Sequence, residues 1–126
     1  MTAPKTNPKT VLVVDDESDV LQVVTRILEF HSFQVLSAAS PQEAIRLGAE
    51  YEGEIDVLLS DVLMQEMPGH LLAAKLTRLR PQMRVILMSG YADGKLRMKA
   101  GWHFIQKPFV PSALVSRVKN ALGSAV

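Results

Sequence analysis

The stretch Val11-Leu12-Val13-Val14-Asp15-Asp16 decides the fold, because a wholly apolar run ends in two adjacent carboxylates. A run that is apolar at every position and rich in β-branched residues is typical of a strand covered on both faces, as in a parallel sheet. Two adjacent carboxylates at the end of a buried strand repel each other and are costly to desolvate, so they indicate a bound cation. The stretch therefore predicts a parallel sheet with a cation site at one end.

Three later apolar runs lead to side chains that carry chemistry. In an open parallel sheet the carboxyl ends of the strands share one crevice, which would gather these side chains together. The crevice would then hold three carboxylates, one hydroxyl and one ammonium group. The runs and the residues that follow them are 57–60 with Asp61, 85–88 with Ser89, and 103–105 with Lys107.

Helical patterns alternate with the strand patterns along the chain. This order predicts the α/β class, with a doubly wound, flavodoxin-like sheet of five parallel strands in the order 2-1-3-4-5. The clearest helix start is Ser40-Pro41-Gln42-Glu43, which offers an N-cap, a proline at the first helical position and a capping-box glutamate. Residues 91–101 are short and contain the poor helix former Gly94, so we expect a short or irregular fourth helix there.

The bulk composition fits one globular domain, which we expect at residues 10–126 after a flexible, polar lead-in at residues 1–9. The net charge of +1 gives no reason to expect a nucleic acid or an anionic membrane as an obligatory partner. The chain has no cysteine, which excludes disulfides, thiolate metal sites and thiol catalysis. With no apolar run that approaches a membrane span, we expect a cytoplasmic protein.

The predicted crevice has the chemistry of metal-assisted phosphoryl transfer. Mg²⁺, or Mn²⁺, prefers oxygen ligands, which Asp15 and Asp16 can supply directly or through water. Asp61 would be both a ligand and the nucleophile, because a carboxylate that attacks phosphorus gives an acyl phosphate. Lys107 and Ser89 could neutralise or hydrogen-bond the oxygens of the transferring group.

These residues, with their order and surroundings, resemble the receiver domain of bacterial response regulators. The likeness covers about residues 10–122, and all five expected positions of the site are filled in the right order. The stretches that carry it are 11–17, 60–64, 88–91 and 107–109, with the sequences VLVVDDE, SDVLM, MSGY and KPF.

The resemblance implies that Asp61 accepts a phosphoryl group from a histidine kinase or a histidine phosphotransfer protein in a Mg²⁺-dependent reaction. The phosphorylated form would then change its partner binding. Such a domain is a signalling phosphoacceptor rather than an enzyme, with at most self-phosphorylation from small phosphodonors and slow autodephosphorylation. The implied metal ligands are Asp15, Asp16, Asp61 and the backbone carbonyl of Leu63.

The same resemblance assigns the switch positions to Ser89 and Phe104. The responding surface would be formed by the fourth helix, the fifth strand and the last helix, which in such domains is also a route to a homodimer. Phe104 alone fits an ordinary core aromatic equally well. The basic residues Lys95, Arg97 and Lys99 fit either a solvated helix face or a docking surface.

The sequence also departs from the family. Gln65 stands where most receivers have a proline, and the chain is about four residues short between Ser89 and Lys107, roughly one helical turn. Leu63 and Tyr91 flank the expected approach of attacking water, where family members often carry polar residues. We hypothesise that these two bulky side chains slow the hydrolysis of the phosphorylated form.

Three other functions compete with this interpretation. A degenerate receiver could keep the fold and serve as a phosphorylation-independent adaptor, and Gln65 and the short fourth helix keep that alternative open. A phosphatase of the haloacid dehalogenase type would need a second aspartate at position 63, which is leucine. A dinucleotide-binding module would need a glycine-rich turn where Asp15-Asp16-Glu17-Ser18 stands.

Overall fold

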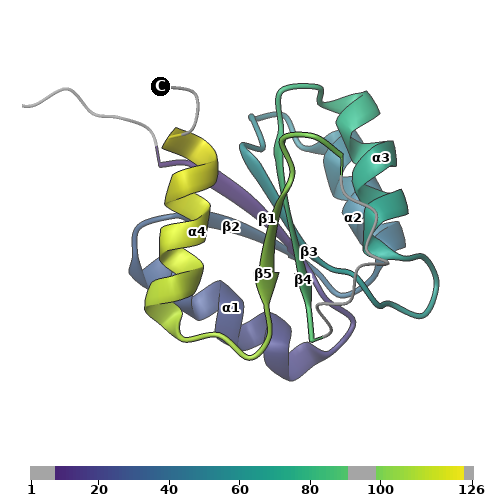
Figure 1. Ribbon diagram of the computed structural model, residues 1–126. Coiled ribbons are helices and arrows are strands. Elements are labelled where there is room, and N and C mark those ends of the chain that lie inside the picture. Colours follow the sequence, from purple (N-terminus) through teal and green to yellow (C-terminus); the bar gives the residue numbers. More distant parts are fainter. Residues whose placement is uncertain (1–7, 91–98, 124–126) are drawn as a thin grey trace, which may run out of the picture.

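The computed structural model describes residues 8–90 and 99–123. Its five strands form one parallel sheet in the order β2-β1-β3-β4-β5, with helices on both faces (Figure 1). The predicted fold class and strand order are confirmed. The strands are β1 Thr10–Val14, β2 Gln34–Ala38, β3 Val57–Asp61, β4 Arg84–Ser89 and β5 His103–Gln106. The helices are α1 Ser18–Phe30, α2 Pro41–Glu50, α3 Gly69–Leu79 and α4 Pro111–Gly123.

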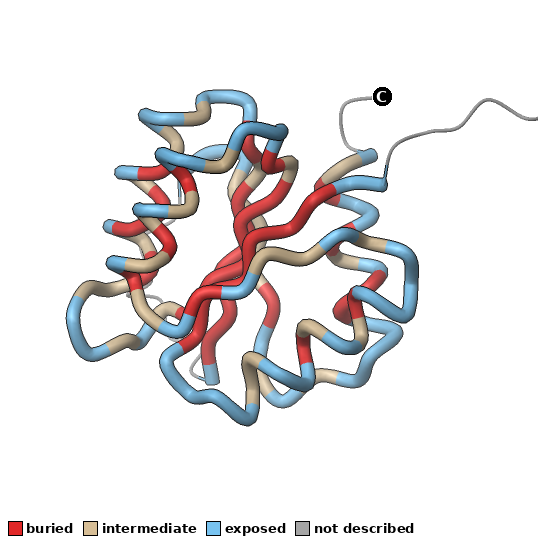
Figure 2. The backbone as a smooth tube through the Cα atoms, turned by 180° about the vertical axis from the view of Figure 1, so that it is seen from behind, coloured by how far each residue is buried: buried red, intermediate tan, exposed pale blue. Residues whose placement is uncertain are grey.

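The core lies on both faces of the central strands. Successive side chains of a strand point to opposite faces, so Val11 and Val13 pack on the side of α1 and α4. Leu12 and Val14 pack on the side of α2 and α3. β1 and β3 are buried at every position, which explains why their sequences show no polar alternation (Figure 2).

The predicted start of α2 is confirmed with one difference. Ser40 is the N-cap, and its Oγ accepts a hydrogen bond from the backbone N–H of Glu43 at 3.1 Å. The Glu43 carboxylate reaches back to the backbone N–H of Ala39 at 3.1 Å, one residue before the expected partner. Pro41 fills the first helical position, where no N–H is needed.

Two expectations fall on parts of the chain outside the described residues. The predicted helix between β4 and β5 would include residues 91–98, and most of the predicted lead-in is residues 1–7. The helix labelled α4 is therefore the last helix of the chain, which the sequence pattern numbers fifth. Among the helices that the structure describes, none is long and apolar enough to cross a membrane.

Arg80, which directly follows α3, ties the ends of α2 and α3 together. Its guanidinium donates to the backbone carbonyls of Gly48 at 2.9 Å and Gly53 at 2.8 Å, and also to that of Tyr51. These carbonyls belong to the end of α2 and the turn after it, where intrahelical donors run out. The two helices also approach closely, because a Cβ on Gly48 would come within 2.5 Å of the Leu76 side chain.

We expect Arg80→Met to lower the free energy of unfolding by about 2 kcal/mol, because hydrogen bonds from a charged donor to otherwise unpaired carbonyls are lost. Urea denaturation measures the effect. The matched control Arg78→Met changes an exposed arginine of α3 and should shift stability by less than about 0.5 kcal/mol. Equal stability of the two variants would contradict the assigned role of Arg80.

Candidate functional site

The register of the sheet brings the predicted site residues to one end. Val14 pairs with Ser60, so the next residues along these two strands, Asp15 and Asp61, are neighbours. Ser89 pairs with Gln106, which places Lys107 directly beyond the end of β4. A hollow at this end is lined by Asp16, Glu17, Asp61, Leu63, Gln65, Ser89, Gly90 and Lys107.

Three carboxylates gather at this end. One oxygen from each of Asp15, Asp16 and Asp61 can be chosen so that all three lie within 4.8 Å of one another. Asp15 is fully buried, Asp61 is 7% exposed and Asp16 is exposed. Three carboxylate oxygens at this spacing, one of them open to solvent, fit a hard divalent cation that keeps some of its waters.

Lys107 lies between the two buried carboxylates. Its Nζ is 3.2 Å from Asp15 Oδ2 and 3.3 Å from Asp61 Oδ1. Burial raises the pKa of Asp61 above its ordinary value, the Lys107 ammonium opposes that shift, and the Asp15 carboxylate adds to it. Burial alone would lower the pKa of Lys107, but the carboxylates of Asp61 and Asp15 outweigh it and raise that pKa.

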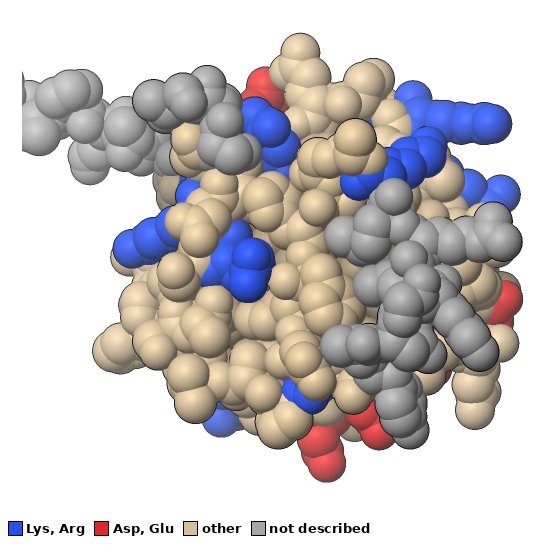
Figure 3. Space-filling view, in the orientation of Figure 1, with Lys and Arg blue, Asp and Glu red and all other residues tan. Residues whose placement is uncertain are grey.

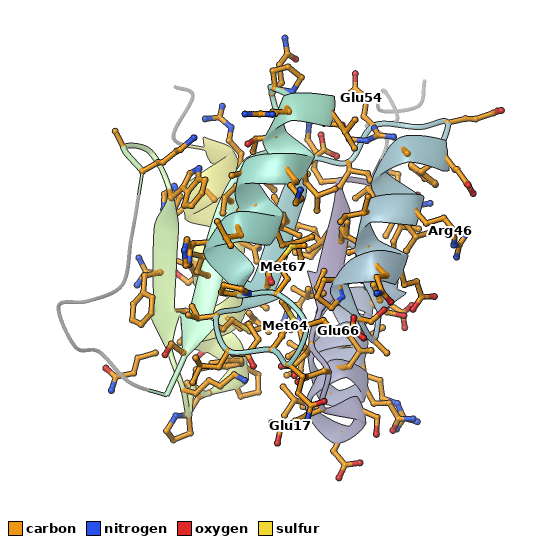
Figure 4. The ribbon with its side chains drawn as sticks, turned by 90° about the vertical axis from the view of Figure 1, so that its right-hand side faces the viewer. Glu17, Arg46, Glu54, Met64, Glu66 and Met67 are labelled. Atoms are coloured by element: carbon orange, nitrogen blue, oxygen red, sulfur yellow. The ribbon has the colours of Figure 1, made fainter. Side chains whose placement is uncertain are left out.

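Backbone N–H groups hold the other oxygens of the acid pair. Asp15 Oδ1 accepts from the N–H of Glu17 at 2.9 Å, so this carboxylate also serves the start of α1. Asp16 Oδ2 accepts from the N–H of Gln65 at 3.1 Å, which joins the end of β1 to the loop between β3 and α3. Figure 4 shows Glu17 beside that loop, which carries Met64, Glu66 and Met67.

The loop between β3 and α3 packs against the backbone of Asp61. The N–H of Gly69, the first residue of α3, donates to the carbonyl of Val62 at 2.8 Å. A Cβ on Gly69 would overlap the carbonyl oxygen of Asp61, so only glycine fits this close approach. The start of α3 therefore fixes the backbone that presents the Asp61 carboxylate.

The remaining predicted residues are placed as follows. Ser89 is 5% exposed, and its carbonyl accepts from the Lys107 N–H at 2.8 Å. Leu63 is 62% exposed at the rim of the hollow. Phe104 is half-buried on β5 opposite Leu87 and does not line the hollow. Tyr91 lies outside the described residues.

A family model for the response regulator receiver domain matches residues 11–119. The chain belongs to this family. Receiver domains are phosphoacceptor modules of two-component signalling rather than enzymes that turn over a substrate, so the predicted class of function is confirmed.

Two related proteins match the chain over a small part of their own length. It is 38% identical over 117 residues to the sensor kinase CckA of Brucella abortus, which covers 90% of this chain and 12% of that protein. It is 33% identical over 116 residues to the transport regulatory protein DctD of Rhizobium meliloti, with 88% of this chain and 25% of that protein covered. The chain thus spans only a small part of the length of these relatives.

Solved structures agree with the fold. The receiver domain of the hybrid histidine kinase CckA has a TM-score of 0.79 and 34% identity, with 90% of this chain and 98% of that chain covered. A CheY-like receiver from Methanospirillum hungatei has a TM-score of 0.84 and 30% identity, with 93% and 95% covered.

Sequence reasoning did not foresee the backbone partners of the acids. The N–H of Gln65 contacts Asp16, yet the sequence showed at that position only a departure from the proline of most receivers. The sequence did contain a clue, because any residue other than proline has a backbone N–H that can donate a hydrogen bond at this position. The close approach of Gly69 to Asp61 had no signal beyond the glycine itself, since it depends on the path of the loop.

We expect Gln65→Pro to weaken divalent-cation binding by about tenfold, because removing a group that orients a ligating carboxylate has effects of this size. Calorimetric titration with Mg²⁺ measures the change. Gln65→Ala keeps the N–H and serves as the matched control, with affinity close to that of the parent. Equal affinity of the two variants, both folded, would show that this hydrogen bond does not position Asp16.

Proposed function

We propose that Asp61 is the phosphoacceptor of this receiver. The observation that supports the proposal best is the arrangement around its carboxylate, with Lys107 Nζ 3.3 Å away and the acids Asp15 and Asp16 beside it. The carboxylate is largely buried but borders a hollow through which a phosphoryl donor can approach. A nucleophile held at such a rim is shielded from bulk water and reachable by an in-line donor.

In the proposed step an Asp61 carboxylate oxygen forms a bond to phosphorus. The bond from phosphorus to the donor breaks at the same time, and the leaving group, imidazole nitrogen or carboxylate oxygen, keeps the electron pair. Lys107 neutralises one oxygen of the transferring group, and the Ser89 hydroxyl donates to another. Both residues border the hollow, so neither needs to be carried to the site by a large movement.

We propose that Asp15, Asp16, Asp61 and the backbone carbonyl of Leu63 hold Mg²⁺. The first three supply oxygens within 4.8 Å of one another, and Leu63 lines the same hollow. When bound, Mg²⁺ would compensate the negative charge that collects on the phosphoryl oxygens. Lys107 already pairs with two carboxylates, so a second cation would help to compensate the negative charge of an incoming phosphoryl group.

The proposed donor is a histidine kinase or a histidine phosphotransfer protein. Membership of the family supports this partner class, and one relative, CckA, is itself a sensor kinase that contains such a domain. We further propose that phosphorylation changes partner binding through Ser89 and Phe104. These two residues lie on the neighbouring strands β4 and β5, and β5 is an edge of the sheet, where a shift at the site can reach the surface.

Incubation with acetyl phosphate and Mg²⁺ should add the mass of one phosphoryl group, as measured by intact-protein mass spectrometry. Asp61→Asn should add none, because an amide oxygen is a poor nucleophile. Asp19→Asn, the same change at an exposed acid of α1, should be phosphorylated like the parent. A folded protein that binds Mg²⁺ but takes no phosphoryl group, from acetyl phosphate or from a kinase, would favour the adaptor function.

Leu63→Asn should speed the loss of the phosphoryl group several-fold, because it replaces an exposed apolar side chain at the rim with one that can orient water. The decay of the phosphorylated mass over time measures the rate. Leu71→Asn changes an apolar residue of similar exposure on α3, away from the hollow, and should leave the decay unchanged. No acceleration in Leu63→Asn would contradict the shielding hypothesis.

A further inference from the structure

The charges of the chain are strongly segregated along the sequence. Residues 62–126 hold ten of the 14 Lys and Arg residues but only two of the 13 Asp and Glu residues. No acidic residue follows Asp93. The net charge of +1 therefore conceals an acidic first half and a basic second half.

The strand order turns this segregation in sequence into segregation in space. The first half of the chain builds β2, β1 and β3 with α1 and α2, whereas the second half builds β4, β5, α3 and α4 at the other edge of the sheet. Figure 3 views the molecule from the β5 edge. Lys and Arg atoms are spread over this view, while Asp and Glu atoms lie towards its rim.

Several cations lie on β4, on α4 and just before β5, on a surface that we name the β5 face and define by Arg84, Lys99, Trp102, His103 and Arg117. His103 pairs with Ile86, two residues beyond Arg84, and α4, which carries Arg117, packs against β4 and β5. Burial lowers the pKa of His103, and the charges of Arg117 and Arg84 lower it further. Both guanidinium charges therefore oppose protonation of the same ring.

The cations of the β5 face lack acidic partners within the described parts of the chain. Arg84, Lys99 and Arg117 form no salt bridge there, and no carboxylate contributes to the pKa shift of His103. Glu54 and Asp56 line the same hollow as Arg84, but neither forms a salt bridge with it. By contrast, Arg46 of α2 does form salt bridges, with both Glu43 and Glu50.

An aromatic side chain, that of Trp102, lies beside one of these cations. Trp102 is half-buried, and Lys99 Nζ lies 5.8 Å from the centre of its ring. Trp102 and Arg84 line the same hollow at the amino ends of the strands. Arginine and tryptophan are the residue types that most often anchor protein interfaces.

We propose that the β5 face binds an acidic segment of another protein, and not a second copy of this chain. A two-fold dimer through this face would set Arg84, Lys99 and Arg117 against the same residues of the other copy, with like charges opposed. An acidic partner instead supplies carboxylates to cations that form no salt bridge within the described residues. The proposal does not depend on Asp61 being the phosphoacceptor.

A polyanion such as a nucleic acid fits the surface less well than an acidic protein does. Strong nucleic-acid binding draws on many phosphate contacts, whereas the β5 face offers three described cations around an aromatic side chain. The acidic half of the molecule would also repel an extended phosphate backbone that ran past the face.

The test uses Trp102, the only tryptophan of the chain, as a fluorescent reporter. The probe is a synthetic peptide of Glu and Asp residues around a few leucines, added to the whole protein before and after treatment with acetyl phosphate. We expect a saturable change in Trp102 fluorescence that weakens with salt. Lys99→Glu and Arg117→Glu should each weaken binding by about tenfold, whereas Arg26→Glu, an equal change of charge on α1, should have little effect.

Three results would overturn the proposal. The first is no saturable response in either state, or equal weakening by Arg26→Glu and Arg117→Glu. The second is tighter binding of an oligonucleotide, or of anionic lipid vesicles, than of the peptide at the same salt concentration. The third is a dimer in sedimentation analysis that Arg117→Glu dissociates, since that would make the face a contact between copies.

Discussion

The ion pair of Lys107 with Asp15 and Asp61 is the interaction on which the rest of the structure depends. Two carboxylates this deeply buried, in neighbouring strands, would be costly to desolvate and would repel each other. A cation must reach them, and the one that does is 92 residues away from Asp15 in sequence. The three groups come together because β1 and β3 are adjacent and because β1, β3 and β5 all have their carboxyl ends at the same end of the sheet. The strand order is therefore what assembles the charged groups of the site.

The strands and the acidic side chains of the site could be predicted from the sequence because each follows from a local pattern with few alternatives. A continuous apolar run such as residues 11–14 fits a strand buried on both faces, and parallel topology then places its last residues in a shared crevice. The contacts made by Arg80 and by the N–H of Gln65 could not be predicted. They depend on where two loops run after the strands have assembled, and no periodic pattern records that path.

The net charge of the chain does not reveal how its charges are distributed along the sequence. A net charge of +1 correctly argued against a uniformly basic protein, but it is the sum of two halves of opposite sign. Whether such halves separate in space depends on topology. In this fold the first half of the chain forms β2, β1 and β3, and the second half adds β4 and β5 at the far edge. The acidic and basic halves of the sequence therefore lie towards opposite edges of the sheet.

Lys107 joins the two oppositely charged halves, because it belongs to the basic half and pairs with Asp15 and Asp61 of the acidic half. It directly follows β5, a strand of four residues that also carries His103 of the β5 face. A phosphoryl group on Asp61 would place new negative charge beside Lys107 and compete with Asp15 for its ammonium. Any resulting movement of Lys107 would act on a short edge strand whose opposite end carries His103 of the β5 face. The fold therefore provides a direct physical route from the phosphoacceptor to the surface proposed to bind an acidic partner.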